Sequence, residues 1–263
     1  GFEPMRFLAV LAALCLSTSP ALAQCGGSFS AFVAGLKQEA VAKGHAPATV
    51  DAFLTHHWTY HPVDATFMGD KGHDALLPPA SAETLAAELA GIETLLDRLE
   101  RTDEPATLED RLDRRMMLAE LRMRRTAAQT RPRLHNPAWY SGEAAFAIIS
   151  LLLPQSMPVR HDALVARLTG MGVFLADAAD RLTGVAAPAG WVKRAQKEAT
   201  AMAGFLRSDI KLHEEFAEDW AEPARQAADA FERFAAAIDN LPDADPACGE
   251  AYLSQIMADI HGL

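Results

Sequence analysis

Residues 81–100, SAETLAAELAGIETLLDRLE, show most directly how this chain folds. Apolar side chains recur there every three or four positions, at Leu85, Leu89, Ile92, Leu95, Leu96 and Leu99. An α-helix turns once in about 3.6 residues, so this spacing gathers the apolar side chains on one face and leaves Glu and Arg on the other. The stretch therefore predicts an amphipathic helix.

The same periodicity recurs along most of the chain. Further helices are predicted over residues 29–43, 49–59, 143–153, 161–183, 189–210, 219–240 and 246–261, and another begins at Thr107. Proline and glycine between residues 62 and 79, and prolines at 132 and 137, predict loops. No stretch alternates apolar and polar residues as a half-buried strand would. The sequence predicts an all-α fold, a bundle of about seven to nine helices without a sheet.

The N-terminal residues have the three parts of a secretory signal peptide. A single cation, Arg6, is followed by the uncharged apolar residues 7–16, and residues 21–23, Ala-Leu-Ala, are small where signal peptidase cleaves. The apolar run is too short to anchor the chain in a membrane. We expect cleavage after Ala23 and a periplasmic or secreted protein.

Two cysteines, Cys25 and Cys248, follow this predicted cleavage site. An even number of cysteines in an oxidising compartment permits a disulfide, which would join the two ends of the mature chain. The alternative is two thiols too far apart to bond. Gln24 is unfavourable immediately before a lipidated cysteine, so we expect neither a lipid anchor nor peripheral membrane attachment.

The charge of the chain excludes some classes of partner. Asp and Glu number 35 and Lys and Arg number 24, which gives a net charge of −11. The predicted leader contains one acid, Glu3, and one base, Arg6, so its removal leaves the net charge unchanged. Nucleic acids and anionic lipid surfaces bind clustered Lys and Arg, so we expect neither as the main partner.

Two groups of residues are candidates for a binding site. His57 and His61 lie four residues apart and His73 follows, a spacing that could bind a transition metal if the intervening loop folded back. The alternative is that these are ordinary loop histidines. Asn136, Trp139 and Tyr140 could line a substrate cleft, because an amide and two amphipathic rings suit peptide or sugar recognition. Alternatively, Asn136 makes a turn and the two aromatic rings pack beneath it.

Two segments of the chain resemble known families. Residues 24–29, QCGGSF, and 32–54, FVAGLKQEAVAKGHAPATVDAFL, resemble the mature start of membrane-bound-B-type lytic murein transglycosylases. That family carries its catalytic glutamate in a Glu-Ser-rich motif, and this sequence contains no Glu-Ser pair. The resemblance therefore transfers no catalytic residue.

The second resemblance is longer. Residues 60–69, YHPVDATFMG, 136–140, NPAWY, and 247–252, ACGEAY, resemble in order the N-terminal half of the bacterial domain-of-unknown-function 885 family. The resemblance implies a helical fold similar to that of zinc metallopeptidases. Complete members carry a His-Glu motif and a later Pro-Gly-His in their C-terminal half.

The chain departs from that zinc motif. Its only His-Glu pair is His213-Glu214, and Ala217 stands where a zinc peptidase needs a second histidine one helical turn away. No Pro-Gly-His is present. We therefore expect this chain to bind no cofactor, and zinc only together with a separate catalytic half.

These observations lead to one organisation and one function. We predict an extension and signal peptide over residues 1–23, a short helical segment over 24–55 and a helical domain over 56–263. The predicted function is a non-catalytic binding or scaffold role, or one wall of a peptide-binding cleft, with a peptide or cell-wall fragment as partner. The alternatives are a peptidase fragment that needs a separate zinc-binding half and a peptidoglycan-processing protein.

Overall fold

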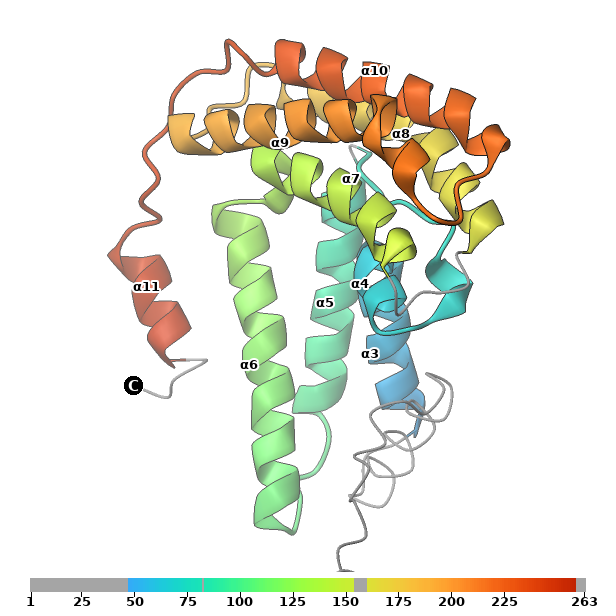
Figure 1. The fold of residues 1–263 in the computed structure, drawn as a ribbon. Helices are drawn as coiled ribbons and strands as arrows, with labels where there is room; N and C mark the ends of the chain where they lie inside the picture. The colour runs from blue at the N-terminus through green and yellow to red at the C-terminus, as the bar shows by residue number, and fades with distance from the viewer. Residues whose placement is uncertain (1–46, 82, 154–159, 259–263) are drawn as a thin grey trace, which may run out of the picture.

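The computed structural model describes residues 47–81, 83–153 and 160–258. Within these ranges the chain forms nine α-helices, α3 to α11, joined by loops and short 3-10 turns (Figure 1). The only β feature of the described residues is one isolated bridge between Ala187 and Asp243. The predicted all-α fold is therefore confirmed. The predicted leader, the predicted helix over residues 29–43 and Cys25 lie outside the described residues.

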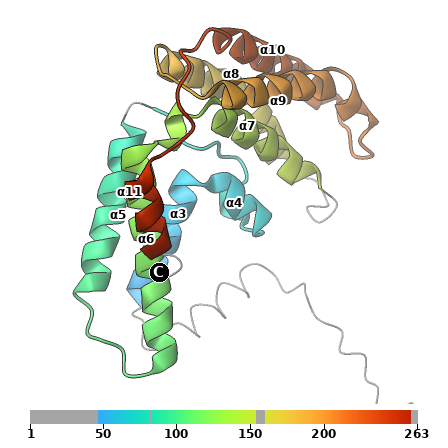
Figure 2. The same cartoon turned by 90° about the vertical axis from the view of Figure 1, so that its left-hand side faces the viewer.

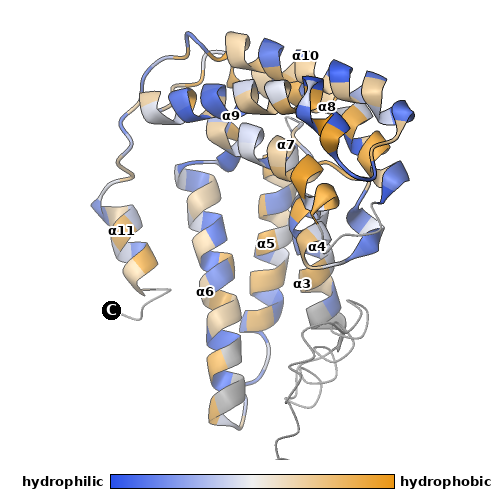
Figure 3. Ribbon diagram, in the orientation of Figure 1, coloured by the Kyte–Doolittle hydropathy of each residue, from blue (hydrophilic) through white to orange (hydrophobic). Residues whose placement is uncertain are grey.

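Four helices form a bundle: α7 (Pro137–Leu152), α8 (His161–Leu182), α9 (Ala189–Arg207) and α10 (Ala221–Ala237). α10 contacts α8 and α9, and α7 contacts the same two helices from the opposite side. Figure 3 shows that α7 is mostly hydrophobic, as expected for a helix covered by others. Large side chains from the inner faces fill the core, among them Tyr140, Leu164, Trp220, Phe231 and Phe234.

The remaining long helices form a hairpin below this bundle. α5 (Thr84–Glu100) packs against α6 (Leu108–Thr130), and α3 (Pro47–Tyr60) contacts α5. The contact builds a second, smaller core, formed by Ile92, Leu95, Leu96, Leu99, Leu118 and Leu121. The amphipathic stripe predicted for residues 81–100 is therefore the buried face of α5.

The structure corrects two predicted loops. Residues 62–67 form a short helix, α4 (Pro62–Phe67), and α7 begins at Pro137 instead of at residue 143. In both cases proline is the first helical residue, where its missing N–H has no intrahelical partner to lose and its fixed φ suits the helix. The Asn136 side chain also accepts a hydrogen bond from the Ala138 backbone N–H and caps α7. Pro62 and Pro137 therefore start helices and do not only interrupt them.

The C-terminal segment crosses from the bundle to the hairpin. α11 (Glu250–Ile256) begins four residues later than the predicted helix over residues 246–261 and lies against α6 (Figure 2). The Arg131 guanidinium holds the preceding segment by donating to the carbonyls of Asp245, Pro246 and Ala247. Cys248 has a free thiol in this segment, and its pairing with Cys25 stays a prediction. No described helix is long and apolar enough to span a membrane.

Candidate functional site

Charged and imidazole side chains gather where the hairpin meets the bundle. They come from α3, α4, α5, α6, the 3-10 turn before α7, and α7 itself, so most elements of the two units contribute to one place. The buried and half-buried side chains of this group need polar partners within the protein, whereas Asp64, with 54% of its side chain exposed, also reaches water. We call these residues the seam cluster: His57, His61, Asp64, Glu88, Arg124, Arg133 and Glu143.

Glu88 is the most buried member of the seam cluster, with 5% of its surface exposed. Its carboxylate accepts a hydrogen bond from Arg133 Nη1 and lies 3.7 Å from His61 Nε2. Burial by itself would raise the pKa of Glu88, but the interaction with His61 and the charge and hydrogen bond of Arg133 outweigh burial and lower the pKa below its usual value. Glu88 is therefore a buried carboxylate that holds two basic side chains in place.

His57 is held in its neutral form. Burial, followed by the nearby charge of Arg124, lowers the pKa of His57 to about 3. Arg124 Nη1 lies 2.9 Å from His57 Nδ1, so the neutral ring accepts a hydrogen bond from the guanidinium through that nitrogen. The other ring nitrogen lies 3.7 Å from the Asp64 carboxylate.

The three histidines considered as metal ligands lie in two places. The rings of His57 and His61 are 4.8 Å apart between centroids, whereas His73 contacts Asp70 and the ring of Trp58. A guanidinium beside His57 disfavours a bound cation. Among the described residues, no three His, Cys, Asp or Glu side chains are grouped so that they could hold one metal ion.

The carboxyl group of Glu143 has a raised pKa. Burial, and then the charge of Asp64, raise the pKa of Glu143 to about 7, although Arg133 and Arg167 act in the opposite direction. A carboxyl group with such a pKa can both donate and accept a proton under ordinary conditions. Strongly shifted pKa values are commonest at functional sites, which makes Glu143 the first candidate for a role in binding.

Arg133 links the cluster to one of the predicted cleft residues. Its guanidinium carbon lies 5.1 Å from the ring centroid of Trp139, and its Nε and Nη2 atoms have no hydrogen-bond partner among the described residues. The other predicted cleft residues have structural contacts, because Asn136 caps α7 and the buried Tyr140 hydroxyl donates to the Leu134 carbonyl. The structure therefore places the Trp139 ring against the guanidinium of Arg133, whereas Asn136 contacts Arg133 through its backbone N–H, which donates to the Arg133 carbonyl.

Comparison with known proteins identifies the family. Residues 62–256 match the family described as Bacterial protein of unknown function (DUF885), from the first residue of α4 to the last residue of α11. The chain belongs to the DUF885 family. No curated protein and no solved structure shows significant similarity to it. Most of the seam cluster lies within the DUF885 match: Asp64, Glu88, Arg124, Arg133 and Glu143. His57 and His61 precede the match.

The single His-Glu pair of this DUF885 chain lies far from the seam cluster in sequence, in the loop between α9 and α10. The Nε2 atom of His213 lies 3.2 Å from the Leu152 carbonyl oxygen, and its Nδ1 atom accepts a hydrogen bond from the Glu215 backbone N–H. Both ring nitrogens of His213 are therefore engaged by the backbone. Ala217, where a second histidine would be needed, provides no ligand.

Glu88, at the centre of this site of the DUF885 chain, is not among the predicted site residues, although the sequence contains one signal for it. Glu88 stands three residues after Leu85 and four before Ile92, so a helix places it on the apolar face of α5. A charged residue on an otherwise apolar face must have a buried partner. The sequence could not reveal that the partner is Arg133.

The raised pKa of Glu143 predicts a dependence of stability on pH. The unfolded chain binds the proton less tightly than the folded one, so Glu143 costs stability as pH rises from 4.5 to about 7. The neutral variant Glu143→Gln is expected to match wild type at pH 4 and to exceed its free energy of unfolding above pH 7, by up to about 3 kcal/mol. Urea unfolding at a series of pH values measures this difference.

A second carboxyl variant controls for the loss of one negative charge. Glu218 lies exposed on the 3-10 turn before α10, and Glu218→Gln is expected to change stability little at any pH. The lowered pKa of His57 acts in the opposite direction, because stability rises with pH between about 3 and 6.5, but His57 is present in every variant and cancels in the difference. If the free energies of unfolding of Glu143→Gln and wild type differ by the same amount at every pH, the pKa of Glu143 is not raised in the folded protein.

Proposed function

We propose that this DUF885 chain is the non-catalytic helical half of a metallopeptidase-like protein and forms one wall of a peptide-binding cleft. The observation that carries the proposal is the state of His213, whose two ring nitrogens both contact backbone atoms. A zinc peptidase of the expected type needs two histidines one helical turn apart and a glutamate that activates the bound water. His213, with Ala217 one turn later, does not supply this arrangement.

The seam cluster supports a role in binding. Arg133 combines a guanidinium with the apolar face of Trp139, and Glu143 adds a carboxyl group that titrates near pH 7. Guanidinium groups bind carboxylate and carbonyl oxygens, and an indole face packs against apolar side chains, so together they suit a peptide. On the basis of the predicted signal peptide, we place this activity in the periplasm or outside the cell.

The proposal is tested with the purified protein and equimolar zinc. Incubated with fluorogenic peptide substrates, wild type and His213→Ala are both expected to show no turnover above the buffer. Labelled peptides from a tryptic digest of casein serve as the binding probe, measured by fluorescence anisotropy. Arg133→Met is expected to raise their Kd at least about tenfold, because one charged hydrogen-bond donor is lost.

The matched control is Arg233→Met, which removes an exposed arginine of α10 and is expected to leave peptide binding unchanged. Stoichiometric zinc together with turnover that disappears in His213→Ala would overturn the non-catalytic assignment. Release of muropeptides from purified sacculi would replace it with a glycan-cleaving function. Equal Kd values for Arg133→Met and Arg233→Met would remove the seam cluster from the binding site.

A further inference from the structure

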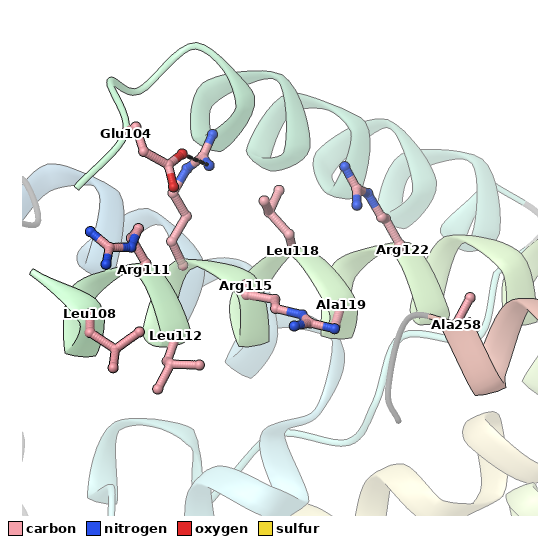
Figure 4. A pocket seen from close by; sticks show the side chains of 10 residues that line it. Glu104, Leu108, Arg111, Leu112, Arg115, Leu118, Ala119, Arg122 and Ala258 are labelled. Atoms are coloured by element: carbon pink, nitrogen blue, oxygen red, sulfur yellow. Dashed lines mark hydrogen bonds and ion pairs between the residues drawn. The ribbon is translucent and has the colours of Figure 1, made fainter. Parts of the chain in front are cut away.

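One face of α6 borders a hollow that is separate from the seam cluster. The hollow has a volume of about 520 Å³ and is lined mainly by α6 between Leu108 and Arg122, with Glu104 and Ala258 at its edges (Figure 4). α11 contacts α6, and Ala258, two residues beyond α11, lies at one end of the hollow. The rest of this face carries no described helix.

Apolar side chains stand exposed along this part of α6. Leu108, Leu112 and Met116 are 65%, 49% and 70% exposed, and their spacing of four residues places them in one row along the helix. Leu108 and Leu112 project from the same side of α6 in Figure 4. The apolar residues of α6 that pack on α5, Leu118 and Leu121, are in contrast buried. A continuous exposed apolar row marks an interaction surface more often than scattered single residues do.

Arginines border the same row. Arg115 has no hydrogen bond or ion pair with any described residue, and Arg111 donates only to the backbone carbonyls of Pro105 and Ala106. Arg122 is paired with Glu100. Two guanidinium charges therefore lie beside the apolar row without a described carboxylate partner, on a chain whose net charge is −11.

We propose that this surface of α6 docks an amphipathic helix of another polypeptide, whose apolar row is flanked by Asp and Glu. Apolar residues one helical turn apart fit between those of a partner helix lying along α6. Carboxylates on the flank of that partner would pair with Arg111 and Arg115. The predicted helix over residues 29–43 suits the surface less well, because it contains Lys37 and Lys43 against one acid, Glu39.

The probe is a labelled synthetic helix of three heptads with Leu at positions a and d and Glu at e and g. A second peptide carries Lys in place of Glu. Wild-type protein is expected to bind the Glu peptide, more weakly as salt is raised, and to bind the Lys peptide at least about tenfold less tightly. Leu112→Asp and Arg115→Glu are each expected to raise the Kd of the Glu peptide at least about tenfold.

Matched controls lie on other helices. Val173→Asp changes an exposed apolar residue of α8, and Arg233→Glu changes an exposed arginine of α10, so both are expected to keep the Kd within about twofold of wild type. Leu112 and Arg115 are exposed, and circular dichroism is expected to show all four variants folded.

Several results would overturn the proposal. They are the absence of binding to the Glu peptide, equal binding of both peptides, and equal Kd values for Leu112→Asp and Val173→Asp. A dimer in sedimentation that dissociates in Leu112→Asp would assign the surface to a second copy of this chain. Tighter peptide binding by a full-length Phe32→Asp variant would assign it to the chain's own N-terminal segment.

Discussion

Replacing Arg167 with methionine is expected to lower the free energy of unfolding by about 3–5 kcal/mol. Arg167 lies on α8 and is fully buried. Its guanidinium ties α8 to α7 and to the segment that runs from α4 towards α5. It donates to oxygens of Thr66, His73, Leu76, Ala147 and Ser150 at 2.7 to 3.3 Å.

Methionine fills similar space but has no N–H group. Each of these five oxygens would lose a hydrogen-bond donor, and a buried group left unsatisfied costs about 1–3 kcal/mol before the chain relaxes. Burial lowers the pKa of Arg167 to about 10, so the wild-type side chain is still charged at neutral pH, helped by the nearby carboxylate of Asp74. The variant therefore removes both a charge and a set of hydrogen bonds.

Arg207→Met is the matched control. Arg207 forms ion pairs with Asp229 and Glu232 at the protein surface, with 39% of its side chain exposed. Exposed ion pairs contribute about 0–1 kcal/mol to stability, so this variant is expected to unfold at nearly the same urea concentration as wild type. If Arg167→Met and Arg207→Met lower the free energy of unfolding equally, the buried hydrogen bonds of Arg167 do not hold α8 to its neighbours.

Truncating Phe231 to alanine is expected to lower the free energy of unfolding by about 3–5 kcal/mol. Phe231 lies on α10 with none of its surface exposed, in the core shared by the bundle helices. Alanine would leave a cavity, because the neighbouring helices are joined in a closed bundle and can collapse only partly. Thermal and urea unfolding followed by circular dichroism measure the loss.

Phe146→Ala provides the comparison on the surface. Phe146 lies on α7, is 50% exposed and contacts the ring of Phe67, so its loss is expected to cost less than about 1 kcal/mol. A smaller effect for Phe231→Ala than for Phe146→Ala would contradict the packing of α10 on the bundle.

The hydrogen bonds of Arg167 and the charge state of the seam cluster are coupled. The charge of Arg167 opposes the rise in the pKa of Glu143. Removing that charge would therefore raise the pKa of Glu143 further. Stability and site chemistry thus depend on the same buried guanidinium.

The sequence by itself determined the helical class of this protein. The repeat of apolar residues along residues 81–100 needs only neighbours within a few positions, and the structure confirms it as the buried face of α5. The same holds for the order of helices from α7 to α10. The family also followed from motifs in the sequence, and the match over residues 62–256 confirms it.

Only the tertiary structure decided which residues meet. Glu88 and Arg133 are 45 residues apart in sequence, and Arg124 reaches His57 across 67 residues. These contacts depend on how α3 and the turn before α7 dock against the hairpin, which no local pattern encodes. Tertiary contacts also shift the pKa of Glu143, because burial and neighbouring charges, not residue type, determine the shift. Local periodicity predicts the helices, whereas the seam cluster forms only where two separate cores come together in the tertiary structure.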